Sequence, residues 1–263
     1  MPKPIEWTGP LIGKFWSAIA ETRLSELSFG KTGGEVLLAL VDRFLPKGAS
    51  VLDYGAGDGD LIPVLLKAGY EVAAFEPSTG RRESLLARSD VQSSKFIGVI
   101  GPEDTRTFDV VLCSEVIEHV LPDEGPAFLR SLFERVKPGG TLVITTPHAE
   151  DLELNSSYCP HCDSLFHRWQ HVRSFTREAL RSELESGGFQ VESVRAADLS
   201  GQVQLYMLRE QVDYFLRQNV FKRLKAALNP QLFPAIRPEN AISVIDGVDD
   251  GSILIAVARR PGA

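Results

Sequence analysis

The amino-acid sequence predicts an α/β protein built on a doubly wound, mostly parallel seven-stranded sheet. Short apolar segments bounded by Gly, Pro, Asp or Ser alternate with longer segments whose apolar residues recur at helical spacing. The first strong strand pattern, at residues 50–54, leads directly into a glycine-rich turn and a helix pattern, which is how a βαβ unit begins. The length of 263 residues and the hydrophobic fraction of 43% suit one domain with a sizeable core.

The expected elements follow in chain order. Apolar residues at three- and four-residue spacing predict helices at residues 11–29 and 34–44, within an N-terminal helical cap of residues 1–45. We expect residues 46–198 and 250–260 to form the core of a single domain, residues 1–263, and residues 199–249 to form a helical lid insertion. The expected strands lie near 50–54, 71–76, 95–99, 109–114, 141–146, 189–195 and 253–258, and the expected core helices near 60–68, 79–88, 124–136 and 176–186.

The turn after the first strand carries three glycines at alternate positions. Gly55 and Gly57 can take positive φ angles, which would let backbone N–H groups approach an anionic or carboxylate-bearing ligand. The next strand ends in Glu76, about twenty residues further on, the separation expected for an acid that binds a ribose diol. The ligand is therefore expected to be a nucleoside. Because Gly59 falls only two residues after Gly57, the spacing differs from G-x-G-x-x-G and argues against NAD.

With Asp53 in front, these glycines form a D-x-G-x-G-x-G pattern that resembles the motif of class I S-adenosylmethionine-dependent methyltransferases. Residues 108–113 resemble the fourth strand of that family, and residues 137–147 its Pro-Gly turn into strand five. The resemblance covers roughly residues 48–198 and the last strand. It implies a Rossmann-like methyltransferase fold and S-adenosylmethionine as cofactor. The residues that it implies at the cofactor are Asp53, Gly55, Gly57, Gly59, Glu76 and Glu115, with Glu103 or Asp104 near the adenine.

An acidic-histidine segment directly follows the fourth strand. If a helix begins there, Glu115, Glu118 and His119 share one face, although helix-dipole, solvation and backbone hydrogen-bonding roles are open for them. The segment resembles the E-x-x-E-H of ubiquinone-type O-methyltransferases and of small-RNA 3′-terminal 2′-O-methyltransferases. The second branch binds a divalent metal through two glutamates and two histidines, and His171 matches the spacing of its last ligand, which would suit Mg²⁺ or Mn²⁺. Without metal, the catalytic candidates are Glu118 and a general base, His119 or His148.

A cysteine-histidine loop offers a second metal hypothesis. Cys159, Cys162, His167 and His171 have a C-x2-C-x4-H-x3-H spacing that could close a tetrahedral, structural zinc site. The spacing resembles a zinc knuckle with histidine in place of the final cysteine. The alternatives are two free thiols, or His171 serving the glutamate cluster instead.

Charge and composition limit the partners. A net charge of −7 gives no electrostatic footprint for nucleic acid. The first residues lack the pattern of a signal peptide, and no apolar run is long enough for a membrane span, so a cytoplasmic location without disulfides is expected. Residues 220–228 place three basic residues opposite an apolar face, which fits a lid helix or, less well, a peripheral membrane contact.

The activity expected from the resemblance is methyl transfer from S-adenosylmethionine, with oxygen of a small-molecule, sugar or lipid-linked acceptor favoured. In-line alignment and exclusion of water would be the main work of the protein. Two alternatives remain open: an RNA-end 2′-O-methyltransferase that uses a divalent metal, and a catalytically silent subunit that only binds the cofactor.

Overall fold

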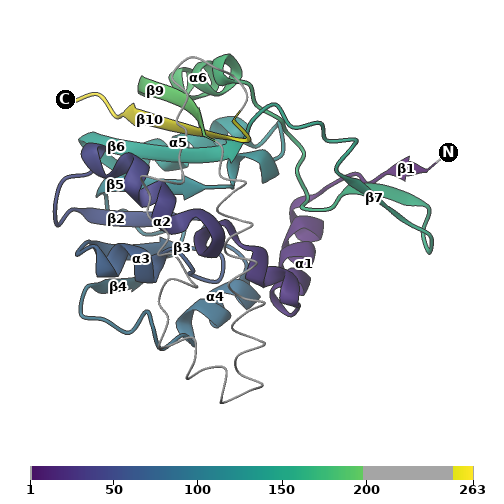
Figure 1. Ribbon diagram of the computed structural model, residues 1–263, viewed down its shortest axis with the longest axis horizontal. Coiled ribbons are helices and arrows are strands. Elements are labelled where there is room, and N and C mark those ends of the chain that lie inside the picture. Colours follow the sequence, from purple (N-terminus) through teal and green to yellow (C-terminus); the bar gives the residue numbers. More distant parts are fainter. Residues whose placement is uncertain (1, 198–250, 263) are drawn as a thin grey trace, which may run out of the picture.

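A computed structural model describes residues 2–197 and 251–262 (Figure 1). A seven-stranded sheet forms its centre. Its strands are β2 (Ser50–Tyr54), β3 (Glu71–Phe75), β4 (Phe96–Val99), β5 (Phe108–Ser114), β6 (Val136–Pro147), β9 (Gln190–Ala197) and β10 (Ile253–Arg259). They lie in the order β4-β3-β2-β5-β6-β10-β9, and β10 alone runs antiparallel to its neighbours β6 and β9. The predicted doubly wound, mostly parallel sheet is confirmed. Its strand order reverses between β2 and β5, where open α/β sheets bind ligands.

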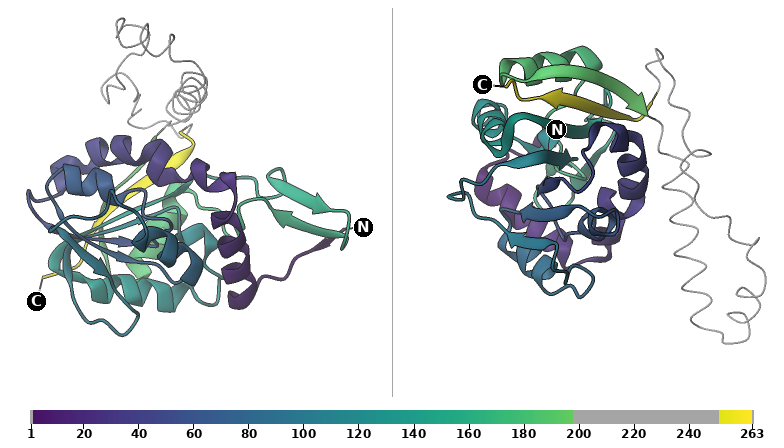
Figure 2. Two further views of the ribbon diagram at one scale, coloured as in Figure 1. Left: turned by 90° about the horizontal axis from the view of Figure 1, so that it is seen from below. Right: turned by 90° about the vertical axis from the view of Figure 1, so that its left-hand side faces the viewer.

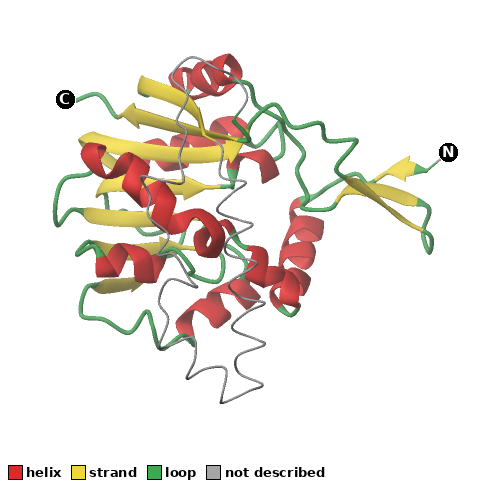
Figure 3. Cartoon of the chain, in the orientation of Figure 1, coloured by secondary structure: helices red, strands yellow, loops and turns green. Residues whose placement is uncertain are grey.

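Helices cover both faces of this sheet (Figure 3). They are α2 (Phe29–Val41), α3 (Ile62–Lys67), α4 (Thr79–Leu86), α5 (Gly125–Arg135) and α6 (Arg177–Ser186). Because side chains alternate along a strand, β2 sends Val51 into one apolar layer and Leu52 into the other. The layer of Val51 contains residues of α2, α3 and α4, and that of Leu52 contains residues of α5 and α6. The sheet is therefore buried on both sides, as its apolar strands predict.

The N-terminal helices differ from the predicted ones in their boundaries. Helix α1 (Gly9–Ala20) ends earlier than expected and is followed by the 3-10 turn η1 (Arg23–Leu27), while α2 starts at Phe29 and continues into the 3-10 turn η2 (Asp42–Phe44). The Gly-rich stretch of residues 30–33, which separates the two predicted helices, lies inside α2. Its glycines serve close packing, because a Cβ on Gly30 would lie 2.9 Å from the Cβ of Asp60. The Ser28 hydroxyl caps the helix by accepting from the Lys31 N–H at 3.4 Å.

A small second sheet projects from the main body (Figure 2). It consists of the hairpin β7 (Ser156–Cys159) and β8 (Ser164–His167), joined by β1 (Lys3–Pro4), which runs parallel to β8. The cysteine-histidine loop predicted from the sequence is therefore a β-hairpin. Its register, in which Ser156 pairs with His167 and Cys159 with Ser164, decides which side chains can meet.

Two expectations fall outside the described residues. These are the helical lid of residues 199–249 and the basic amphipathic segment of residues 220–228. Among the helices of residues 2–197 and 251–262, no helix has the length and apolar character needed to cross a membrane.

Candidate functional site

The glycine turn lies between the end of β2 and the start of α3. Gly55, Gly57 and Gly59 have φ angles of +84°, +57° and +79°, in the region that side chains with a Cβ avoid. A Cβ on Gly55 would lie 2.5 Å from Val116, and one on Gly57 would lie 2.9 Å from Arg81. The turn therefore requires glycine both for its backbone conformation and for the close approach of its neighbours.

The backbone amides of this turn bind the protein itself, which corrects the expectation that they face a ligand. The N–H groups of Gly55 and Ala56 donate to the carbonyl of Phe75, and that of Gly59 donates to the carbonyl of Ala56. The Gly57 N–H donates to Glu76 at 2.7 Å. The alternating glycines fold the turn back over the end of β3, so the shape of the turn, and not an open cradle of amides, forms this end of the site.

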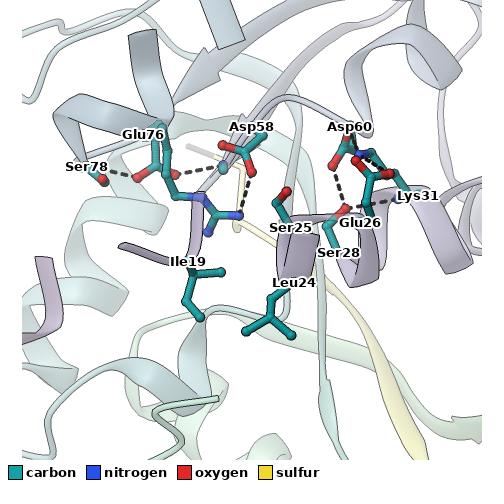
Figure 4. A network of polar contacts seen from close by, with 12 residues as sticks. Ile19, Leu24, Ser25, Glu26, Ser28, Lys31, Asp58, Asp60, Glu76 and Ser78 are labelled. Atoms are coloured by element: carbon teal, nitrogen blue, oxygen red, sulfur yellow. Dashed lines mark hydrogen bonds and ion pairs between the residues drawn. The ribbon is translucent and has the colours of Figure 1, made fainter. Parts of the chain in front are cut away.

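Glu76 holds the turn from the neighbouring strand. Its two carboxylate oxygens accept hydrogen bonds from the N–H groups of Gly57 and Ser78, each at 2.7 Å (Figure 4). Burial raises its pKa, while the hydrogen bonds from Ser78 and Gly57 and the nearby Arg81 oppose that shift. Each oxygen keeps a second lone pair, so a role toward a ribose diol stays a prediction.

Asp53 and Ser114 contribute buried polar atoms that have no hydrogen-bond partner within the described part of the chain. These atoms are the Asp53 Oδ2 and the Ser114 Oγ, at the ends of the adjacent strands β2 and β5. Burial, with Glu76 and Asp60 nearby, raises the pKa of Asp53 to about 7. Unsatisfied buried oxygens of this kind suit a ligand that brings a positive charge and N–H donors, such as the amino acid end of S-adenosylmethionine.

Asp53, Ser114 and the glycine turn line a cavity of about 270 Å³, whereas Glu76 is not among its lining residues. Ile19 and Leu24 form part of its apolar side, and Figure 4 shows them below the network of Asp58 and Asp60. The Arg81 guanidinium lies 4.9 Å from the ring centroid of Trp16 and donates to Asp58 at 3.3 Å. The remaining lining residues come from η1 and the start of α2, from the glycine turn, from the end of β5 and η3, and from the loop after β8. They include Phe29, Asp53, Gly55, Gly57, Ser114, Glu115, His119, Trp169 and His171.

The acidic-histidine segment does not form the α-helix that was expected. Glu115 has a φ of +53°, and a short 3-10 turn, η3 (Ile117–His119), follows. Glu115 accepts from the Thr145 hydroxyl at 2.8 Å, and Glu118 accepts from that of Thr146 at 3.0 Å. Consecutive residues of β6 point to opposite faces of the sheet, so the two glutamates lie on opposite sides of its end. The expected shared face of Glu115, Glu118 and His119 is wrong.

Burial strongly perturbs all three of these groups. It raises the pKa of Glu115 to about 7 and that of Glu118 well above its ordinary value. Burial, together with the neighbouring His171, lowers the pKa of His119 to about 3. His119 is therefore neutral at physiological pH and holds an extra proton poorly.

Sequence reasoning missed Glu150, which follows β6 and contacts two histidines. Its Oε1 lies 3.2 Å from the Nε2 of His167, and its Oε2 is hydrogen-bonded to the Nδ1 of His171. The two imidazole rings stack with centroids 4.3 Å apart. The available signal was a carboxylate just beyond the carboxyl end of a central strand, where catalytic residues of α/β proteins lie.

The proposed zinc knuckle is not assembled. Pairing of Ser156 with His167 places Cys159 three residues further along the hairpin, beside Ser164. Within the described ranges, the groups whose ligand atoms lie within 4.8 Å of one another are Glu118, His119 and His171, and Glu150, His167 and His171. Neither contains Cys159 or Cys162. Glu115 is also outside both groups, so the set of two glutamates and two histidines is incomplete as well.

Three further candidates lie away from the cavity lining. The His148 ring pairs through Nδ1 with the Gly251 carbonyl at 2.8 Å. Asp104 accepts from the Arg106 guanidinium at 2.7 Å, and Glu103 is exposed next to it. None of the three is among the residues that line the cavity. His148 therefore does not face the site as a base, and nothing places Glu103 or Asp104 against an adenine.

Comparison with known sequences gives a consistent match. Residues 29–194 match the family described as a methyltransferase domain. The chain is 32% identical over 160 residues to the mitochondrial ubiquinone biosynthesis O-methyltransferase of Homo sapiens, covering 56% of this chain and 43% of that protein. It is 31% identical over 164 residues to the ubiquinone biosynthesis O-methyltransferase of Xanthomonas axonopodis pv. citri, covering 58% and 67%. The chain thus spans less than half the length of the human relative.

Solved structures share the fold. One is the 1,6-didemethyltoxoflavin-N1-methyltransferase of Burkholderia thailandensis, with bound 1,6-didemethyltoxoflavin and S-adenosylhomocysteine. The TM-score is 0.53 at 15% identity, and the alignment covers 99% of this chain and 94% of that one. At this identity the likeness concerns the fold alone.

Proposed function

Since this chain belongs to the class I S-adenosylmethionine-dependent methyltransferases, we propose that it methylates a hydroxyl group of a small-molecule acceptor. One observation carries the proposal. A single cavity is lined both by the glycine turn with Asp53 and Ser114 and by the ring of His171. Cofactor and acceptor can therefore share one space that is partly closed to water, which is what in-line transfer requires.

The side chains at the glycine turn fit the cofactor. S-adenosylmethionine supplies a methyl group on a positively charged sulfur, which is already a strong electrophile. The Asp53 Oδ2 and the Ser114 Oγ, both buried and unpartnered in the described chain, would bind its amino acid end. Glu76 would keep the turn in shape and contribute a lone pair to the ribose. Ile19 and Leu24 would exclude water from the other side.

Oxygen as the accepting atom rests on two supports. The relatives from Homo sapiens and Xanthomonas axonopodis are both named as O-methyltransferases. A hydroxyl must also lose its proton during transfer, and imidazole groups lie at the cavity. The net charge is −7, which gives the chain no overall electrostatic attraction for a polyanion such as RNA. The RNA-end alternative is therefore less well supported than a small-molecule acceptor.

A labelled-methyl assay tests the proposal. The purified chain would be incubated with S-adenosylmethionine carrying a radioactive methyl group and with a fractionated extract of small metabolites. We expect release of S-adenosylhomocysteine and one labelled product, whose methyl ether is identified by mass spectrometry. Label on nitrogen or carbon would contradict the choice of oxygen. Cofactor binding without turnover in any fraction would favour the silent subunit.

A further inference from the structure

We propose that His171 is the general base of methyl transfer and that Glu150 and His167 are the positioning residues that orient it. The inference deepens the proposed function and rests on it. The three side chains form a relay in which each hydrogen bond fixes the next one. The relay begins at the backbone and ends at the cavity.

The backbone fixes the tautomer of His167. The Nδ1 of this ring accepts hydrogen bonds from the N–H groups of Trp169 at 3.3 Å and His171 at 3.1 Å. A proton on Nδ1 would face these two donors, so the nitrogen must carry a lone pair. A neutral imidazole then has its only proton on Nε2. The Nε2–H of His167 therefore donates to Glu150 at 3.2 Å.

This assignment removes His167 as a metal ligand. Metal binding requires a lone pair on the coordinating nitrogen, but its Nδ1 lone pair is used by the backbone and its Nε2 carries a proton. The cluster of Glu150, His167 and His171 satisfies the spacing of a metal site but not its proton arrangement. The cluster is a hydrogen-bonded relay instead.

Glu150 is the charged centre of the relay. Burial would raise its pKa, but hydrogen bonds from His167 and His171 outweigh burial and lower the pKa to about 2. An ionised carboxylate can only accept, so its contact with the Nδ1 of His171 requires a proton on that nitrogen. The neutral ring of His171 therefore has its lone pair on Nε2. The His171 ring lines the cavity, and we therefore assign this lone pair to an acceptor bound there.

His119 cannot replace His171 in this role. Its pKa is lowered to about 3, so its protonated form is strongly disfavoured. Its ring packs edge-on against Trp16, with centroids 4.8 Å apart, and its Nδ1 lies 3.5 Å from the Gln170 carbonyl. Among residues 2–197 and 251–262, no carboxylate holds it within normal hydrogen-bond distance, and Glu118 Oε1 lies 3.8 Å from its Nε2. His119 therefore forms part of the wall.

The proton and electron balance of the step is simple. As the acceptor oxygen forms its bond to the methyl carbon, the bond between that carbon and sulfur breaks and its electron pair goes to sulfur. The hydroxyl proton passes to the Nε2 of His171. The resulting imidazolium is stabilised by the Glu150 carboxylate and later releases its proton to water. The pattern of a carboxylate orienting a basic imidazole is the one used in catalytic triads.

Several titratable groups contact the His171 ring or line the cavity or the η3 turn beside it, and they influence the pH profile. They come from the strand ends, from the loop after β6, from η3, from the hairpin and from α4, and they are Glu115, Glu118, His119, Glu150, His167 and Arg81. Removing the Glu150 charge removes the closest partner of the imidazolium. The acid limb of the pH–rate profile is then expected to move.

A test of the relay does not need the acceptor. The full chain, labelled with ¹⁵N in its five histidines, would be studied by long-range ¹H–¹⁵N correlation spectra at neutral pH, with each ring assigned by a His→Gln variant. We expect His167 with its proton on Nε2 and His171 with its proton on Nδ1, and a loss of the second preference in Glu150→Gln. Glu153→Gln, an exposed change in the same loop, is the control. A His171 proton on Nε2 in the wild type would overturn the proposal, even if the protein is an active methyltransferase.

A second measurement separates a base from a metal ligand. With the acceptor identified by the labelled-methyl assay, His171→Gln should lower kcat about 10²–10⁴-fold with little change in cofactor affinity. Glu150→Gln should lower kcat less and shift the acid limb of the pH profile, which a merely structural change would leave in place. Unchanged kcat in His171→Gln, or selective broadening of its resonances by Mn²⁺ added to the wild type, would show that Nε2 has another use. An inactive wild type in that assay would instead count against the proposed function, leaving the tautomer result to stand by itself.

Discussion

The two walls of the cavity are built in different ways. The cofactor wall comes from one βαβ unit, in which Asp53, the glycine turn and Glu76 are close in sequence and meet through adjacent parallel strands. The histidine wall contains His119 and His171, and Glu150 is hydrogen-bonded to His171; the three residues come from separate segments of the chain. The difference teaches that the residues of a site can be predicted from the sequence when one local unit supplies them. They cannot be predicted in this way when they come from loops that meet only in the folded chain.

Removal of the Glu76 charge should have the largest effect on the cofactor wall. In Glu76→Gln, one of the two carboxylate oxygens is replaced by an NH₂ group. This NH₂ group then faces the N–H of Gly57 or Ser78, so two donors meet without an acceptor. A buried donor left unpaired costs about 1–3 kcal/mol, so we expect S-adenosylmethionine affinity to fall about 5- to 150-fold. Calorimetric titration measures it, with Glu71→Gln, an exposed change on the same strand, as control. Equal affinities of the two variants would break the idea that Glu76 shapes the turn.

Asp53 should show opposite effects on stability and on binding. The pKa of Asp53 is raised to about 7 in the folded protein, from 3.8 in the unfolded chain. Its contribution to the free energy of unfolding is therefore fully present below pH 3.8 and is lost as the pH rises through 7. Asp53→Asn should therefore raise the melting temperature at pH 8 while weakening S-adenosylmethionine binding. Scanning calorimetry and titration check the pair of effects, with Asp123→Asn as an exposed control.

The same linkage predicts proton release on binding. A positively charged ligand favours ionised Asp53, so near pH 6.5 the wild type should release part of a proton when the cofactor binds, and Asp53→Asn should release less. Titrations in two buffers of different ionisation enthalpy give this number. Identical release from both proteins would assign the coupling to another group.

His119 should affect acid stability in the opposite pH range. The pKa of His119 is lowered to about 3 in the folded protein, from 6.5 in the unfolded chain. Its contribution to the free energy of unfolding is therefore present above pH 6.5 and is lost as the pH falls toward 3. Relative to wild type, His119→Gln should lose less stability between pH 6.5 and 4. Urea unfolding at several pH values measures this, with the exposed His161→Gln as control. A parallel loss of stability in wild type and His119→Gln would mean that the ring is not buried in solution.

The cysteine pair should matter least. Cys159 and Cys162 lie on the projecting hairpin, apart from the histidines of the cavity. Changing both to Ser should leave cofactor affinity unchanged and shift the free energy of unfolding by less than about 1 kcal/mol. If the pair and His171 shared a zinc ion after all, the double variant and His171→Ala would each lose zinc and stability together, which elemental analysis would reveal.

The sequence predicted the sheet, its order of elements and the cofactor wall, because strand patterns, glycine spacing and the acid at the end of β3 are local features. It did not predict that the Phe75 carbonyl and the Glu76 carboxylate accept hydrogen bonds from the N–H groups of the glycine turn. Those bonds depend on how tightly the turn folds back over β3. It also placed Glu115 and Glu118 on one face, because a helix was assumed directly after β5, where Glu115 in fact has a positive φ. Glu150 carried no motif, and only the fold shows that it meets His171.

The most direct test of the account is a crystal structure of the chain with S-adenosylhomocysteine. We predict one molecule in the cavity, with its amino acid end against Asp53 and Ser114, its ribose beside the Glu76 end of β3, and its sulfur facing the His171 ring. A sulfur directed away from His171, or a molecule bound outside the cavity, would contradict the claim that the two walls form one methyl-transfer site.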